Sequence, residues 1–220
     1  MEIRRDLAAE NPRTYLPDVA MTLNNLAILQ SDQNDVESAQ ANYEEALQSY
    51  RDLAAENPRI YLPDVAMTLN NLAVLQSDQN NVESAQANYE EALEIRRDLA
   101  TENPRTYLPD VAATLNNLAN LQKAQNNVES AQANYEEALE IRRDLAAENP
   151  RTYLPDVAKT LINLSIFYLQ AVPDTDRSVG MAVEVLEIFQ DFQEIPIVVR
   201  YAETAVRVLQ ANGVDISQQP

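Results

Sequence analysis

Paired glutamates are the feature of this sequence that comes nearest to a site for general acid–base chemistry. Glu44 and Glu45 are adjacent, and the pair recurs at Glu90–Glu91 and Glu136–Glu137. Adjacent residues of a helix point about 100° apart, so the two carboxyl groups do not face one substrate and instead lie toward solvent. The 220 residues include no His, no Cys and only two Gly, which leaves no common nucleophile–base pair, soft-metal site or phosphate loop. We therefore predict that this segment is not an enzyme and binds no metal or cofactor.

The charge of the chain limits its partners. Its 16 Lys and Arg against 35 Asp and Glu give a formal net charge of −19. Nucleic acids and anionic membrane surfaces attract proteins with Lys and Arg footprints, so we predict neither as a partner. A basic protein partner is compatible with this charge, and the simpler alternative is that acidity keeps a repeated chain soluble.

The sequence shows no membrane anchor and no export signal. No run reaches about 18 apolar residues, and the start, residues 1–6, is not followed by the apolar stretch of a signal peptide. We therefore predict a cytoplasmic protein.

A block of 46 residues occurs three times in the sequence with few changes. The proline of an Asn-Pro pair recurs at this interval, at Pro12, Pro58, Pro104 and Pro150. Consecutive copies, which begin at residues 11, 57 and 103, differ at seven and then at six positions. Self-similarity at such a period is typical of stacked repeats, which build an extended surface.

Each copy is predicted to form a pair of helices. In the first copy, the residue before the proline of Asn11–Pro12 is pushed out of the α region, so we predict a helix stop followed by a linker over residues 13–16. A second proline suits a first helical turn, which predicts a first helix over about residues 17–33. After a turn at residues 34–35, apolar residues at spacings of three and four predict a second helix over residues 36–56.

The first helix of each pair has two different faces. Its predicted core face groups Val19, Leu23, Leu26 and Gln30. Its opposite face groups Met21, Asn24, Asn25, Ile28 and Asp32. The opposite face is too polar for a core, yet it carries apolar side chains, so we predict that it contacts a ligand.

The changes between copies collect on this opposite face. Four of the six differences between the second and third copies lie in the first helix, at Met67/Ala113, Val74/Asn120, Ser77/Lys123 and Asp78/Ala124. Three of them fall on the opposite face and Ser77/Lys123 borders it, whereas the core face is unchanged. This pattern favours a specificity surface. The alternative is free variation of an exposed face, although the exposed glutamates of the second helices have not changed.

These repeats resemble the tetratricopeptide repeat family. The spacing of small and large residues that carries the resemblance is formed by Leu23, Leu26, Ala27, Gln30, Ala39, Tyr43 and Ala46. The usual period is about 34, and the longer wording Pro-Asp-Val-Ala-x-Thr-Leu-Asn-Asn-Leu-Ala is similar to the repeats of kinesin light chains and of bacterial multidomain arrays. The resemblance implies an all-α fold, a right-handed superhelical solenoid of antiparallel helix pairs.

The resemblance also implies a binding site, because the first helices of such arrays line a concave groove whose asparagines bind the backbone of an extended peptide. An amide side chain both donates and accepts hydrogen bonds, which suits a peptide group. The residues implied are Met21, Asn24, Asn25, Ile28, Asp32, Met67, Asn70, Asn71, Val74, Asp78, Ala113, Asn116, Asn117, Asn120, Lys123, Lys159, Asn163 and Ile166. The alternative is that each Asn hydrogen-bonds to a neighbouring repeat.

Two features depart from the family pattern. Gln30 and its counterparts stand where the family has a Tyr, which only Tyr168 retains, and a packed Gln must find hydrogen-bond partners. The first two repeats place Asp32 and its counterpart in the groove rather than Lys or Arg, so we do not expect capture of a C-terminal carboxylate. Lys123 and Lys159 make the other end of the groove more basic.

The two ends of the array differ from its middle. Residues 2–10 duplicate the second half of a second helix, so we predict either a fragment of a longer array or a makeshift cap. Near the other end, we predict a divergent second helix over about residues 177–193 and a capping helix over residues 196–211. The predicted units are 1–16 (partial helix and linker), 17–56, 63–102 and 109–148 (repeats one to three), 155–193 (divergent repeat four) and 194–220 (capping helix and tail).

Three hypotheses about function follow from the sequence. The first is a protein-interaction module that binds a peptide or a partner protein in the groove of the first helices. The second is a passive spacer within a larger regulatory protein. The third is self-association through the N-terminal edge, where we expect Ile3 and Leu7 to be exposed.

Overall fold

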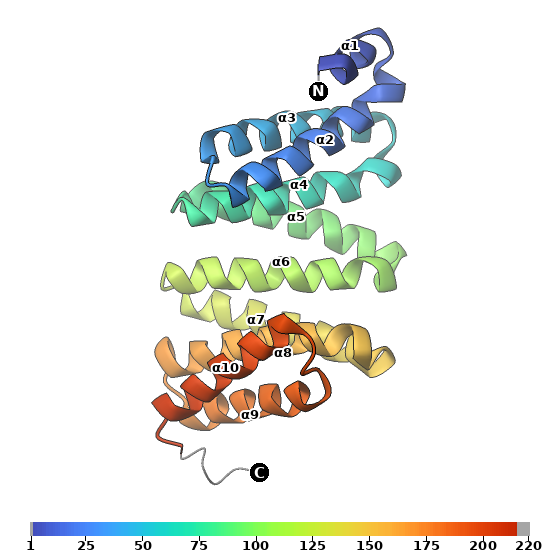
Figure 1. Ribbon diagram of the computed structural model, residues 1–220. Helices are drawn as coiled ribbons and strands as arrows, with labels where there is room; N and C mark the ends of the chain where they lie inside the picture. The colour runs from blue at the N-terminus through green and yellow to red at the C-terminus, as the bar shows by residue number, and fades with distance from the viewer. Residues whose placement is uncertain (1, 215–220) are drawn as a thin grey trace. The chain divides into compact units, whose positions relative to one another are not determined.

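The structure is a computed structural model that describes residues 2–214, with the side chains of residues 6–214. Within these residues the chain forms ten α-helices (Figure 1). Their bounds are α1 (Glu2–Glu10), α2 (Pro12–Asp32), α3 (Val36–Glu56), α4 (Pro58–Asp78), α5 (Val82–Glu102), α6 (Pro104–Ala124), α7 (Val128–Glu148), α8 (Pro150–Gln170), α9 (Thr175–Asp191) and α10 (Pro196–Ala211). The end of the predicted tail, residues 215–220, lies outside the described residues. The predicted all-helical array with a period of 46 residues is confirmed.

The chain divides into two compact units, residues 1–107 and 108–220. In the first unit, α2 packs on α3, and α4 packs on both α3 and α5. In the second unit, α8 packs on both α7 and α9, while α10 packs on both α8 and α9. Each unit is therefore built from neighbouring antiparallel helix pairs, as predicted.

The first helix of each pair begins earlier than predicted. α2 starts at Pro12, so residues 13–16 are helical and the predicted linker is wrong. Asn11 alone separates α1 from α2, and its carbonyl accepts a hydrogen bond from the Tyr15 N–H at 3.2 Å. Proline suits the first helical position because the N–H it lacks would be unpaired there in any case. Pro17 lies inside α2, where it supplies no N–H to the helix ladder.

The turn inside each pair has the conformation that an asparagine tolerates. Asn34 has φ 61°, and Asn80 and Asn126 have φ 60°. The Asn34 N–H donates to the Ser31 carbonyl at 2.9 Å, and the next N–H donates to the Gln30 carbonyl at 2.8 Å. These two bonds form a Schellman motif, which ends the helix and reverses the chain. The predicted turn is confirmed.

Each packed glutamine finds the partner that its burial requires. The Oε1 atom of Gln30 accepts a hydrogen bond from Asn42 Nδ2 at 2.6 Å. The same amide pair recurs in the next two repeats at 2.7 Å, as Asn88 to Gln76 and Asn134 to Gln122. The pair joins the two helices of one repeat. Where the family has a Tyr, this chain therefore has a Gln whose hydrogen bond to an Asn makes the polar contact.

The last helix pair is joined by different contacts. Ser165 Oγ donates to the Ser178 carbonyl at 2.7 Å, and Ser178 Oγ donates to the Ser165 carbonyl at 2.9 Å. Both serines are buried and join α8 to α9. The Tyr168 hydroxyl, in the place of the glutamine, donates to Glu136 Oε1 at 2.9 Å and accepts from Arg177 Nη1 at 2.7 Å. This pair therefore carries contacts that the other repeats lack.

Candidate binding surface

One stripe of residues runs along the first helix of each repeat. On α2 it consists of Asp18, Met21, Asn25, Ile28 and Asp32, at spacings of three and four. We name the surface formed by this stripe and its counterpart on α4 the A face of the first unit, and the surface formed by the counterparts on α6 and α8 the A face of the second unit. Asp18 was not among the predicted site residues, although its position three residues before Met21 is the signal that places it there.

The structure sorts the predicted site residues by exposure. The exposed ones are Met21, Asn25, Ile28, Asp32, Val74 and Asp78. The half-buried ones are Met67, Asn70, Asn71, Ala113, Asn117, Asn120, Lys123, Lys159, Asn163 and Ile166. The buried ones are Asn24 and Asn116. All six exposed residues belong to α2 and α4, so the accessible part of the predicted site lies in the first unit.

Exposed apolar side chains gather on the A face of the first unit. Met21 is 48% exposed and Ile28 is 40% exposed on α2, and Val74 is 39% exposed on α4. Figure 1 shows α2 and α4 beside each other, and the two helices are in contact. Two of these side chains lie two helical turns apart on one helix, and Val74 occupies on α4 the position that Ile28 has on α2. An apolar patch bordered by polar residues is typical of an interaction site.

Two predicted amides are not accessible to a ligand. Asn24 is 2% exposed and Asn116 is 0% exposed. Adjacent residues point about 100° apart on a helix, so when Asn25 faces outward its neighbour Asn24 turns toward the packed side. On α2 and α6, therefore, the first amide of the pair is withdrawn from the surface, whereas Asn70 and Asn71 on α4 are both half-buried.

One amide contact follows the alternative, in which asparagines join neighbouring repeats. Asn163 Nδ2 on α8 donates to Asn116 Oδ1 on α6 at 3.0 Å. Within one repeat, the Tyr135 hydroxyl donates to Asn120 Oδ1 at 2.6 Å. Two buried amide atoms, Asn24 Oδ1 and Asn116 Nδ2, have no hydrogen-bond partner among the described residues. The asparagines thus divide into structural ones and accessible ones.

The cations of the second unit are partly withdrawn from solvent. Burial lowers the pKa of Lys123. Burial also lowers the pKa of Lys159, and the nearby Arg142 guanidinium lowers it further while Asp156 partly opposes the shift. Both shifts disfavour the charged amine. The A face of the second unit keeps exposed acids near the starts of its helices, at Asp110 and Asp156, but it has no large exposed apolar residue and no acid at the end of α6 or α8.

Arg142 is a buried cation that sequence reasoning missed. Its side chain is 3% exposed, and Nη1 donates to the Asp156 carbonyl at 3.1 Å and to Thr160 Oγ1. Its burial lowers its pKa. The same position holds Tyr50 in the first repeat, which suggested an apolar site. Its role is to join α7 to α8, below the A face.

The described residues show two further features that bear on function. No helix between residues 2 and 214 is long and apolar enough to cross a membrane. Within the same range, no group of three or more Asp and Glu residues is arranged to hold a metal ion.

Comparison with known proteins identifies relatives of this fold. Two sequence models described as tetratricopeptide repeat match residues 64–144 and residues 19–57, which together make up more than half of the chain. No curated protein sequence matches the chain significantly.

Solved structures agree with these matches. The crystal structure of BtubC (BKLC) from P. vanneervenii is 27% identical, covers 96% of this chain and 80% of its own, and superposes with a TM-score of 0.73. The crystal structure of a putative kinesin light chain from Podosopora anserina, with nearly identical TPR-like repeats, is 20% identical. It covers 90% of this chain and 88% of its own with a TM-score of 0.66, a likeness in fold.

Proposed function

This chain belongs to the tetratricopeptide repeat family, and from that premise we propose that the A face of its first unit binds an extended peptide or an exposed segment of a partner protein. Repeats of this family are generally protein–protein interaction modules and generally non-enzymatic. The observation that carries the proposal is the gathering of exposed apolar side chains on the A face, at Met21, Ile28 and Val74. The position of the differences between copies supports the same surface. The protein then acts as a scaffold without chemistry of its own.

The accessible asparagines are the expected contacts to the peptide backbone. Asn25 is exposed, and Asn71 at the same position of α4 is half-buried. Each amide can hydrogen-bond both to a peptide N–H and to a peptide carbonyl. Two such residues on neighbouring helices suit a ligand of extended backbone and varied sequence.

Replacing Asn25 and Asn71 together with Ala is expected to weaken binding at least about fivefold, since each amide–peptide hydrogen bond contributes about 0.5–1.5 kcal/mol. The probes are peptides selected from a random display library against the unaltered chain, and affinity is measured by fluorescence anisotropy. The control replaces Gln40 and Gln86 with Ala, which removes two amides from the second helices, where each bonds to a glutamate on the same helix. Equal affinity of both variants for the selected peptides would contradict the proposal.

A second candidate function is self-association through the edge of α2. Leu29 is 52% exposed there, whereas its counterparts Leu75 and Leu121 are 3% exposed. Leu75 packs against α3 of the preceding repeat, in a cluster with Tyr43. The edge of α2 therefore presents a repeat interface whose apolar residue is open to solvent. Of the residues expected earlier at this edge, Leu7 is half-buried and the Ile3 side chain lies outside the described residues.

Self-association would appear as a molar mass that rises with concentration in sedimentation equilibrium. Leu29→Lys is expected to remove this rise, because it places a charge in the open interface. The matched control is Ile60→Lys, the same kind of change at a residue that is 62% exposed near the start of α4. A monomer at every concentration, or an equal effect of the two variants, would exclude this edge.

A further inference from the structure

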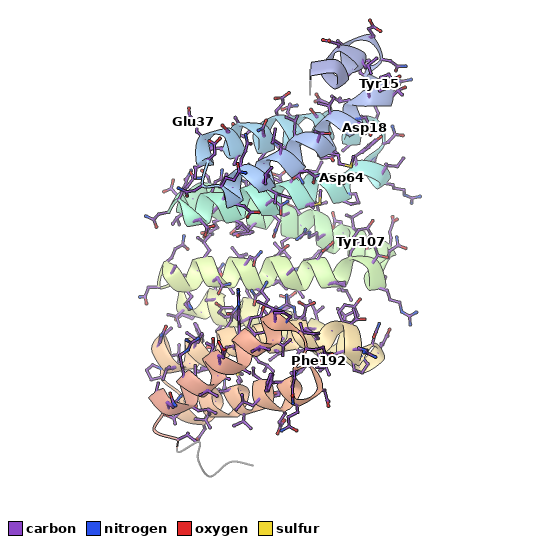
Figure 2. The ribbon with its side chains drawn as sticks, in the orientation of Figure 1. Tyr15, Asp18, Glu37, Asp64, Tyr107 and Phe192 are labelled. Atoms are coloured by element: carbon purple, nitrogen blue, oxygen red, sulfur yellow. The ribbon has the colours of Figure 1, made fainter. Side chains whose placement is uncertain are left out.

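The A face of the first unit repeats one pattern on two helices. Along α2 the order is acid, apolar, amide, apolar, acid, and along α4 the order is the same. The outer acids are Asp18 and Asp32 on α2 and Asp64 and Asp78 on α4. Fourteen residues of helix separate the acids of each pair by about 21 Å. Figure 2 shows Asp18 and Asp64 on these neighbouring helices.

The acids that end the two stripes, Asp32 and Asp78, have no cation beside them on the A face of the first unit. The stripes of α2 and α4 contain no Lys or Arg. Asp32 and Asp78 are exposed, and among residues 6–214 neither forms an ion pair. The arginines at the starts of α2 and α4, Arg13 and Arg59, pair with Glu56 at 3.2 Å and with Glu102 at 3.5 Å. Since the chain as a whole carries a formal charge of −19, this face attracts cations.

The fold does not need the acids at the ends of α2 and α4. A carboxylate in the last turn of a helix opposes the helix dipole, and Asp32 and Asp78 are the last residues of their helices. The third and fourth repeats have Ala124 and Gln170 at this position, yet α6 and α8 have the same length as α2 and α4, 21 residues. The acids are therefore retained at positions where they do not stabilise the helix.

The apolar rows need a partner for a different reason. Met21 and Ile28 lie about 10 Å apart along α2, and Val74 occupies the position of Ile28 on α4. A ligand that covered the row would bury this apolar surface.

We propose that the A face of the first unit binds a segment of a partner protein in which apolar side chains are flanked by Lys or Arg. This inference rests on the proposed function and specifies its ligand. The apolar side chains cover Met21, Ile28 and Val74, and the cations pair with Asp32 and Asp78 at the ends of α2 and α4. Charge complementarity of this kind raises the association rate and selects against acidic segments.

The charge is tested with three synthetic peptides of equal length, one of Lys and Leu, one of Glu and Leu, and one of Lys and Ser. Only the Lys–Leu peptide is expected to bind the unaltered chain well. In the double variant Asp32→Asn and Asp78→Asn its affinity should fall about tenfold, and the salt dependence of binding should become shallower. The same variant should melt at an equal or slightly higher temperature, because the change removes two charges that oppose helix dipoles.

The control for charge is the double variant Glu37→Gln and Glu83→Gln. It removes the same charge from exposed positions in the first turns of α3 and α5, and Figure 2 labels Glu37 at its end of α3. Its affinity for the Lys–Leu peptide should change less than about twofold. An equal loss in both variants would mean attraction by net charge alone and would overturn the inference.

The apolar contribution is tested by giving α4 the residues of α6. The triple variant Met67→Ala, Val74→Asn and Asp78→Ala copies Ala113, Asn120 and Ala124, which the same chain already accommodates. Its helix should remain folded by circular dichroism, and it should bind the Lys–Leu peptide about tenfold more weakly. Undiminished affinity would overturn the inference, as would binding of the Lys–Ser or Glu–Leu peptide as tightly as Lys–Leu.

The inference and the proposed function fail in different ways. If library-selected peptides lose affinity for the asparagine variant while the Lys–Leu peptide fails to bind, the A face is a binding surface for a different ligand. If the selected peptides bind the asparagine variant unchanged, the proposed function itself is wrong.

Discussion

Raising the pH from about 10 to about 12 is expected to unfold this protein, because its buried tyrosines hold their protons only in the folded state. Burial raises the pKa of Tyr43 from 10.0 to about 12, with a further contribution from Asp32. Burial likewise raises the pKa of Tyr50, Tyr89 and Tyr135. A raised pKa stabilises the folded state fully below pH 10, and this stabilisation is lost as the pH rises through the folded value.

The magnitude of this loss is large for a protein of this size. Two pKa units at Tyr43 correspond to about 2–3 kcal/mol, and the other tyrosines add to it in the same direction. Total stabilities are about 5–15 kcal/mol. Tyrosinate absorbance and far-ultraviolet circular dichroism should therefore change together in one transition. Tyr43→Phe removes one of these protons. Once its stability at neutral pH is allowed for, this variant should unfold at a higher pH than the unaltered chain. Ionisation of the tyrosines near pH 10 with an intact fold would contradict the prediction.

Tyr135→Ala is expected to destabilise the second unit by about 3–5 kcal/mol. The Tyr135 side chain is fully buried, and its ring meets Phe167 edge to face with centroids 5.8 Å apart at 63°. Its hydroxyl also donates to Asn120. Tyr135→Phe keeps the ring and should cost about 0.5–1.5 kcal/mol. Urea unfolding followed by circular dichroism measures both changes.

The matched comparison for Tyr135 is Tyr43, which has the same position in the first repeat. There the place of Phe167 is taken by Leu75, which packs in the same cluster as Tyr43. Tyr43→Ala should therefore be less harmful than Tyr135→Ala by about 0.5–1.5 kcal/mol, the usual contribution of an aromatic pair. Equal costs at the two positions would show that the aromatic contact does not stabilise the second unit.

The second helices and the turns were predictable because their signals are local. The predicted bounds of residues 36–56 agree with α3, whose N-cap Asp35 accepts a hydrogen bond from the Ser38 N–H at 3.4 Å. The turn at Asn34 needs a residue that tolerates positive φ, and asparagine does so better than most. The capping helix ends at an Asn-Gly pair, with φ 78° at Gly213, for the same reason.

The start of the first helices was not predictable from local signals, because two prolines compete. Pro12 and Pro17 both suit a first turn, and the sequence alone favoured the second. The structure starts α2 at Pro12 and keeps Pro17 inside the helix, so the other contacts of the helix must outweigh the cost of an interior proline. Tertiary packing of Tyr15 and its neighbours holds the extra turn in place.

The candidate site was predictable as a face but not in detail. Helical spacing placed Met21, Ile28 and Asp32 together, and the structure shows all three exposed. Spacing could not decide which of two adjacent amides turns inward, and the structure buries Asn24. That choice depends on the neighbouring repeat, which a pattern within one helix does not contain.

The reciprocal serine contact between α8 and α9 has a consequence for how the chain finds its register. The first three repeats are nearly interchangeable, so a helix that docks one repeat too early or too late meets an almost identical surface and is hardly penalised. Ser165 and Ser178 can satisfy each other only when α8 meets α9. Folding that begins with α8 and α9 therefore leads to a single pairing of helices. Each earlier repeat then adds to a neighbour whose position is already fixed.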